Sequence, residues 1–202
     1  MKRTRIVGLL TAAFLLAGAA LGFAGGFRLG AELSAEFVDR PSVEAVMQEF
    51  DQTANLIPGL YWEYAPSNFG IGMTALLDLN KSPAPAPVGE QLWLDWISSL
   101  DVRYHFLGSQ AFLDPFIEGG FGAAGRSDIT DYEALGVGSN DWTPTHLSLF
   151  GQVGAGLALK LSIFHLGAKA DWRFWNGVVP GTNYDPYPLK NVSVAVFGGL
   201  AF

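Results

Sequence analysis

The sequence contains no cysteine, and only 15% of its 202 residues are charged. A chain without thiols can form no disulfide, no cysteine-ligated zinc or iron–sulfur centre and no cysteine nucleophile. Its three histidines lack metal-ligand spacing, so we expect neither a metal nor a cofactor. Basic residues are also scarce, with 12 Lys and Arg against 19 Asp and Glu and a net charge of −7. That balance excludes the concentrated basic face that a nucleic-acid partner requires.

The start of the chain predicts a secretory signal peptide over residues 1–24. Three basic residues lie among the first five, an uncharged stretch follows over residues 6–27, and small residues surround Ala24. We expect cleavage after Ala24, which leaves residues 25–202 as a single acidic domain. An uncleaved membrane anchor is the alternative, because 22 uncharged residues are long enough to span a bilayer.

Beyond residue 25 the sequence alternates between apolar and polar residues in eight segments. In the first segment every odd position from Phe27 to Phe37 is apolar, and every even position is charged or small. A period of two indicates a β-strand with one apolar and one polar face. Pro58 weakens the second segment, Ile97 interrupts the fourth, and Phe116 lies on the wrong side of the fifth. The predicted strands cover residues 27–37, 55–64, 69–79, 92–106, 115–125, 146–159, 164–174 and 191–202.

The connections between these strands alternate in length. Long connections cover residues 38–54, 80–90, 126–145 and 176–189, and short ones cover residues 65–68, 107–111 and 160–163. An even number of strands with tight turns at one end and long loops at the other predicts an all-β fold, an eight-stranded antiparallel up-and-down transmembrane β-barrel. A soluble eight-stranded barrel with apolar residues inside is the alternative, and alternation alone does not separate the two.

Aromatic residues of the apolar face favour the transmembrane barrel, because they gather where the strands end, as in the girdles at bilayer interfaces. The polar face mixes both signs of charge with glycine, which suits a narrow interior. A membrane barrel also closes its sheet edges, since unpaired backbone groups are costly in lipid. The predicted girdles contain Phe27, Trp62, Tyr64, Phe69, Tyr104, Phe106, Phe164 and Phe202 at the short-turn end, and Phe37, Trp172 and Phe174 at the other end.

The C-terminal strand carries the most specific pattern, with Val194, Val196, Leu200 and a terminal Phe202 on one face. With this ending the chain resembles the small eight-stranded outer-membrane barrels of diderm bacteria, such as the OmpA transmembrane domain, OmpX and OmpW. The resemblance implies a monomer in contact with outer-membrane lipid, in which those four residues signal to the barrel-assembly machinery. Gly198 departs from the family pattern, which has a bulky apolar residue there.

Charged residues on the polar face are expected to pair across the lumen, because a lone buried charge is costly. One interpretation is a plug of salt bridges and aromatic side chains that conducts nothing. The alternative is a narrow pathway gated by Glu32, Glu118, Arg103 and Lys169. The candidate lumenal residues are Glu32, Asp95, Asp101, Arg103, Glu118, Lys169, Asp171 and Arg173, with Trp93, Phe116, Phe150 and Phe197 as fillers.

The long loops contain two further features. Val43, Val46, Met47 and Phe50 recur at helical spacing, which predicts a short amphipathic helix in the first loop. This apolar patch either packs over the barrel mouth or contacts an extracellular partner or an apolar solute. The second loop contains the proline-rich run over residues 81–87, which predicts a stiff extended spacer.

His146 and Ser148 resemble the His-x-Ser pair of a lipid A deacylase, which would indicate a catalytic role. The downstream Glu of that family is absent, and the alternation turns both side chains inward, away from a lipid substrate. We therefore expect no enzyme. The sequence favours an outer-membrane barrel with a structural or surface-interaction role. The alternatives are a narrow gated channel for ions or small apolar solutes and, after it, a lipid-modifying enzyme.

Overall fold

The computed structural model describes residues 26–37, 55–83, 88, 90–130, 144–178 and 191–202. The predicted signal peptide and the predicted loop helix with Val43, Val46, Met47 and Phe50 lie outside these residues. Among the described residues, no helix is long and apolar enough to cross a membrane.

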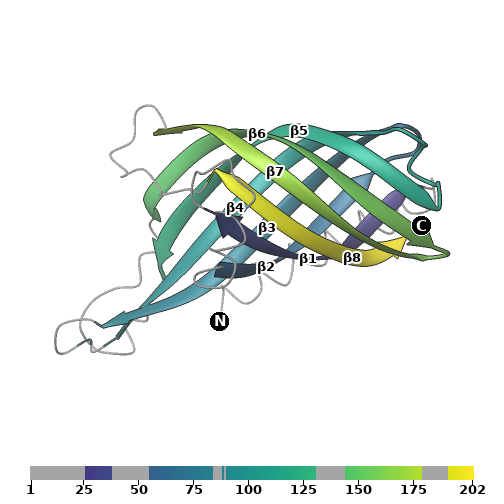
Figure 1. Ribbon diagram of the computed structural model, residues 1–202. Helices are drawn as coiled ribbons and strands as arrows, with labels where there is room; N and C mark the ends of the chain where they lie inside the picture. The colour runs from purple at the N-terminus through teal and green to yellow at the C-terminus, as the bar shows by residue number, and fades with distance from the viewer. Residues whose placement is uncertain (1–25, 38–54, 84–87, 89, 131–143, 179–190) are drawn as a thin grey trace.

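Eight antiparallel strands follow one another around a closed barrel (Figure 1). Each strand pairs with its neighbours in sequence, and the first strand also pairs with the last. The predicted eight-stranded up-and-down β-barrel is therefore confirmed. The strands are β1 (Phe27–Phe37), β2 (Asn55–Tyr64), β3 (Phe69–Pro83), β4 (Glu90–His105), β5 (Leu113–Asp128), β6 (Pro144–Leu161), β7 (Phe164–Val178) and β8 (Val192–Ala201).

The register of the strands fixes the dimensions of the barrel. A circuit of paired residues that starts at Phe27 passes once around all eight strands and returns to β1 at Phe37, about ten residues further along. With a rise of about 3.3 Å per residue and strands about 4.8 Å apart, this shift tilts the strands by about 40° and gives a radius of about 8 Å. A lumen of this radius is filled by the side chains that point into it.

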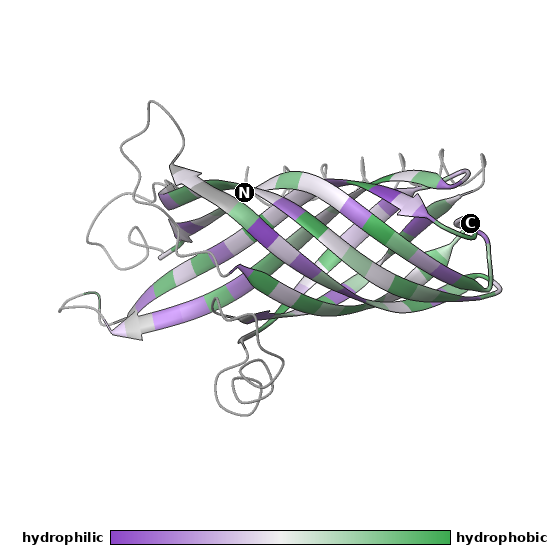
Figure 2. Cartoon of the chain, turned by 45° about the horizontal axis from the view of Figure 1, so that its top comes forward, coloured by the Kyte–Doolittle hydropathy of each residue, from purple (hydrophilic) through white to green (hydrophobic). Residues whose placement is uncertain are grey.

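Hydropathy alternates along each strand, so the two faces of the wall differ in chemistry (Figure 2). The outer face exposes large apolar side chains on every strand, and the inner face carries nearly all of the buried charges. Of the predicted short-turn girdle, Phe69, Phe106, Phe164 and Phe202 are exposed. Phe27 is buried, so its predicted exposure at the rim is wrong.

The strands extend further toward the long connections than the alternation predicted. β3 continues to Pro83, which pairs with Glu90, so the first three residues of the predicted proline-rich spacer belong to a strand. Pro83 is tolerated there because it stands at the end of its strand. Likewise Arg126, predicted to lie in a loop, belongs to β5 and pairs with Asp95 of β4.

Two apolar clusters fill parts of the interior between the charges. The upper cluster, toward the long connections, consists of Ile57, Leu76, Ile97, Ala124 and Phe150. The lower cluster consists of Tyr61, Phe116, Ala158 and Phe197. Ile97 and Phe116, which interrupt the alternation in the sequence, are therefore side chains that fill the lumen.

A charged substitution at Leu60 tests whether the outer face of the barrel lies in the hydrocarbon of a membrane. Its side chain is 67% exposed about halfway along the apolar band, so Leu60→Arg should lower the free energy of unfolding from lipid vesicles by about 2–4 kcal/mol. Urea titration followed by tryptophan fluorescence measures the change, and the volume-conserving Leu60→Met serves as control. A change within about 0.5 kcal/mol for the arginine variant would instead support a soluble barrel, where an exposed site tolerates charge.

Candidate functional site

The interior of the barrel is lined by charged side chains of both signs. All the charged residues singled out from the sequence are buried there: Glu32, Asp95, Asp101, Arg103, Glu118, Lys169, Asp171 and Arg173. The strands bring them together because inward-facing positions of neighbouring strands share the narrow lumen. Their role as a plug or as a gate stays a prediction.

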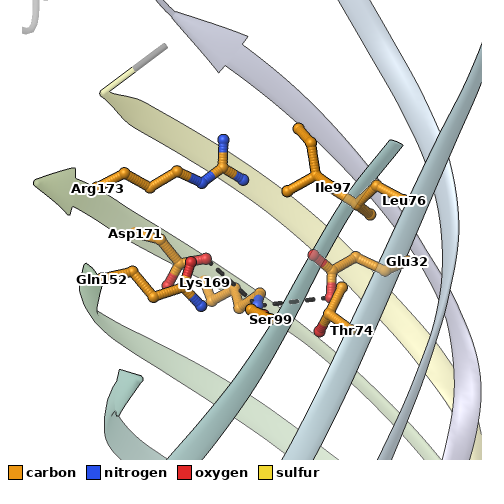
Figure 3. A pocket seen from close by; sticks show the side chains of 9 residues that line it. All are labelled: Glu32, Thr74, Leu76, Ile97, Ser99, Gln152, Lys169, Asp171 and Arg173. Atoms are coloured by element: carbon orange, nitrogen blue, oxygen red, sulfur yellow. Dashed lines mark ion pairs between the residues drawn. The ribbon is translucent and has the colours of Figure 1, made fainter. Parts of the chain in front are cut away.

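Lys169 is the centre of the network at mid-height. Its Nζ atom lies 3.1 Å from Oε1 of Glu118, 3.3 Å from Oδ2 of Asp171 and 3.6 Å from Oε2 of Glu32. Figure 3 shows Lys169 between Asp171 and Glu32, which come from opposite sides of the view. One ammonium group thus compensates three carboxylates from β1, β5 and β7.

Arg103 holds the other oxygen of Glu118. Its Nε atom lies 2.5 Å from Oε2 of Glu118, and its guanidinium lies over the ring of Phe116, 4.9 Å from the centroid. Glu118, on β5, therefore bridges two cations, Arg103 from the neighbouring β4 and Lys169 from β7. Asp101, on the same strand as Arg103, accepts hydrogen bonds from Ser99 at 2.8 Å and from Gln152 at 2.6 Å.

A second network at the short-turn end went unnoticed in the sequence. Arg28 lies 2.8 Å from Oδ2 of Asp114 and 3.4 Å from Oε2 of Glu63, and it donates to the backbone carbonyl of Ser109. The ring of His105 bridges the same two acids, with Nδ1 2.9 Å from Asp114 and Nε2 2.8 Å from Glu63. Glu63 also meets Arg103 at 3.3 Å, which joins this network to the one at mid-height.

The two histidines at the short-turn end are both buried in the lumen. His105 is fully buried in the short-turn network, and His165 is buried beside Tyr61, with the two ring centroids 5.5 Å apart. Arg28 and Glu63 stand on the polar side of their alternating segments, so the period of two already pointed inward for both. Asp114 precedes the predicted fifth strand, which is why no pattern indicated it.

The upper end of the interior carries two further ion pairs. Arg126 approaches Asp95 with two nitrogens, at 2.6 and 2.7 Å, and Arg173 pairs with Glu36. The side chain of Arg126 is 37% exposed, so the network reaches solvent here. Arg173 also lies over the ring of Phe150, 5.5 Å from its centroid. The charged levels therefore run from one end of the lumen to the other.

No protein-family model matches the chain, and no curated protein matches it in sequence. Among solved structures, the chain is similar to Ail, the attachment invasion locus protein of Yersinia pestis, solved in complex with the heparin analogue sucrose octasulfate. The identity is 11% and the TM-score 0.47, over 87% of this chain and 96% of that one. Neisserial surface protein A is similar at 15% identity and a TM-score of 0.47, over 87% and 95%. The barrel assignment rests on this chain's own strand pairing.

The space left within the network is small. One cavity of about 10 Å³ lies between Glu32, Thr74, Ser99, Lys169 and Asp171, roughly the room that one water molecule needs. The described residues contain no group of three His, Asp or Glu side chains arranged to hold a metal ion. This cavity beside Lys169 therefore has room for about one water molecule.

The C-terminal residues predicted as the assembly signal lie on the outer face of β8. Val196, Leu200 and Phe202 are exposed, and Val194 is half-buried. Phe202 donates from its backbone nitrogen to the carbonyl of Phe27 at 2.8 Å, so the last residue also completes the seam between β8 and β1. Recognition by the assembly machinery remains a prediction.

His146 and Ser148, the pair considered for catalysis, are not arranged as a nucleophile and its base. Ser148 is fully buried, and Nδ1 of the half-buried His146 contacts the hydroxyl of Thr145 at 3.0 Å. A triad needs the histidine within reach of the nucleophile and oriented by a third group. The contact with Thr145 directs the ring of His146 to a different hydroxyl.

Removing the central cation should destabilise the barrel. Lys169→Ala leaves three buried carboxylates without their shared ammonium, and we expect a loss of about 3–5 kcal/mol in unfolding free energy. Urea unfolding in lipid vesicles measures it.

Lys160→Ala is the matched control, because that lysine is partly exposed and contacts Gln110 at the turn, so its loss should cost under about 1 kcal/mol. Adding Glu118→Gln to Lys169→Ala should recover part of the loss. Equal stability of the two lysine variants would contradict the central role of Lys169.

Proposed function

We propose that this chain is an outer-membrane β-barrel with a structural or surface-interaction role, whose lumen is closed by paired charges. The observation that carries the proposal is the series of ion pairs, which are spaced along the interior from Arg28 at one end to Arg126 at the other. An apolar outer face around a charged interior is the arrangement of a barrel in lipid, and it reverses that of a soluble barrel.

Localisation in the outer membrane of a diderm bacterium follows from the same features. The predicted signal peptide over residues 1–24 would direct export, and the exposed apolar face would contact outer-membrane lipid. Insertion by the barrel-assembly machinery would use Val194, Val196, Leu200 and Phe202. We propose a monomer, because pairing of β1 with β8 closes the sheet without a partner strand.

Surface interaction is assigned to the end of the barrel that carries the long connections. Residues 38–54, 84–89, 129–143 and 179–191 all join strands at that end. The patch of Val43, Val46, Met47 and Phe50 is the candidate contact for an extracellular partner. Deletion of these connections should abolish binding to a cell surface or matrix while the barrel still folds.

A narrow gated channel is the second candidate, favoured by one observation. The water-sized cavity beside Lys169 interrupts the packing at mid-height, so movement of the shared lysine would join it to the upper lumen. Glu32, Glu118, Arg103 and Lys169 would then form the gate. We propose no catalytic activity.

Single cysteines test the proposed orientation, since the chain has no thiol of its own. In intact cells, a membrane-impermeant maleimide should label Ser139→Cys in the third long connection. It should reach Ser67→Cys, in the exposed short turn between β2 and β3, only after the outer membrane is permeabilised. Gel mobility with and without boiling confirms that both variants fold. Labelling of Ser67→Cys alone in intact cells would reverse the orientation, and labelling of neither would contradict surface exposure.

A further inference from the structure

The turn between β4 and β5, residues 106–112, is fastened to its neighbours at the short-turn end of the lumen. Ser109, at the centre of this turn, is buried, although connecting turns usually lie exposed. Its hydroxyl donates to the carbonyl of Ala65 in the β2–β3 turn at 2.5 Å. Its backbone carbonyl accepts a hydrogen bond from Arg28 of β1. The β4–β5 turn is therefore held both by the adjacent turn and by a side chain inside the lumen.

His105 stands where this turn leaves β4. Its backbone N–H donates to the carbonyl of Asn68 at 2.7 Å, and its carbonyl accepts from Nδ2 of Asn68 at 2.6 Å. Gly70 of β3 leaves room for the ring, because a Cβ atom there would lie 3.2 Å from Nε2 of His105 and 2.8 Å from Oε1 of Glu63. Backbone and neighbours together thus fix the position of the ring.

Both nitrogens of the His105 ring contact carboxylates. Nδ1 lies 2.9 Å from both oxygens of Asp114, and Nε2 lies 2.8 Å from Oε1 of Glu63. An ionised carboxylate only accepts hydrogen bonds and a neutral imidazole has a single N–H, so the two contacts require either a doubly protonated ring or a protonated acid. Arg28 lies 2.8 Å from Asp114, and Arg103 lies 3.3 Å from Glu63, which favours the ionised form of both acids. The second proton therefore belongs on the ring.

The charges at this end of the lumen balance only if the ring is an imidazolium. Glu63 and Asp114 bring two negative charges, and Arg28 brings one positive charge to both of them. Arg103 is already held by Glu118, at 2.5 Å. A buried negative charge without a partner is costly, so a charged His105 supplies the missing cation.

The remaining groups around the ring come from several strands. β3 contributes Gly70, and β5 contributes the ring of Phe116, whose centroid lies 6.0 Å from that of His105. Lys160 of β6 and His165 of β7 also belong to this end of the barrel, but they interact with other side chains. Among the described residues, the charge of the ring is thus governed by Arg28, Glu63, Arg103 and Asp114.

We propose that His105 is a charged imidazolium at neutral pH and that, together with Arg28, it holds the β4–β5 turn in place at the short-turn end of the lumen. The ring orients Glu63 and Asp114, and Arg28 reaches from these two acids to the carbonyl of Ser109. We call this set of five residues the turn latch. Loss of the proton would leave a nitrogen lone pair facing a carboxylate oxygen, which repels it. The turn latch should therefore loosen as the pH rises and stay closed at mildly acidic pH.

The turn latch deepens the proposed closure of the lumen, because it gives the short-turn end a fastening that depends on one proton. The charge on the ring can nevertheless be measured whether or not the lumen conducts. Failure of the turn latch and failure of the closure are therefore separate results.

Nitrogen NMR of the ring tests its charge directly. The mature barrel, labelled with ¹⁵N in its histidines, is refolded in detergent micelles and titrated from about pH 6 to about pH 10. At about pH 7.5 both ring nitrogens of His105 should show the chemical shift of a protonated nitrogen and an attached hydrogen. A free imidazole is about nine-tenths neutral at that pH. The variant His105→Gln, whose folding is verified by the unboiled gel shift, assigns the signals.

Amide exchange in the turn tests the latch itself. The N–H of Ser109 donates to the carbonyl of Ser67 at 3.4 Å, and its protection is measured at each pH relative to the intrinsic rate of the unfolded sequence. Protection should fall by about tenfold or more as the ring loses its proton, the loss expected for one charge-assisted hydrogen bond. In His105→Gln protection should be low throughout and independent of that titration. In the matched control His165→Gln, which removes the other buried histidine of this end, the pH profile should be unchanged.

A neutral His105 ring at about pH 7.5 would overturn the proposal, and so would a pH profile of protection that survives His105→Gln. A charged ring whose titration leaves the protection of Ser109 unchanged would overturn the turn latch as well. Ion conduction by the unmodified barrel while the ring is charged would contradict the proposed closure of the lumen, and the NMR result would still decide the charge of His105.

Discussion

Glu118 is shared by Arg103 and Lys169, and the charged interior of the barrel is built around this carboxylate. Closure of eight tilted strands leaves a lumen about 8 Å in radius, so every inward charge must find its partner within that space. Arg103 extends the network down to Glu63, Arg28 and His105. Lys169 links it to Glu32 on β1 and to Asp171 on its own strand, β7. We propose that the ion pairs that satisfy buried charge also close the lumen, which would link stability to closure.

The strands and their faces were predictable because a wall with lipid on one side imposes a strict period of two. That period placed all the candidate charges on the inner face, and it placed Arg28 and Glu63 there as well. The ion-pair partner of each charge could not be predicted from the sequence. Lys169, Glu118 and Glu32 lie on three different strands. Which of them meet depends on the stagger of the strands around the barrel, and the alternation within one strand does not predict that stagger. The ends of the strands were predicted wrongly for a similar reason, because Pro83 and Arg126 belong to strands through pairing with residues of the neighbouring strand.

Residues that broke the alternation proved informative in another way. Ile97 and Phe116 depart from the apolar-out pattern because they belong to the apolar clusters that fill the lumen between the ion pairs, and Pro58 lies where the β2–β3 ladder ends. The interior is consequently layered, with ion pairs at the short-turn end, at mid-height and at the upper end, and two apolar clusters between them.

The central claim is that the charged network closes the lumen, and conductance measures this most directly. The mature chain, refolded in detergent and verified by circular dichroism and an unboiled gel shift, would be inserted into a planar bilayer. The account predicts a folded barrel without discrete openings, because the described side chains leave room for about one water molecule at mid-height. Reproducible single-channel openings of the unmodified protein would contradict it and would make the gated pathway through Lys169 the better description.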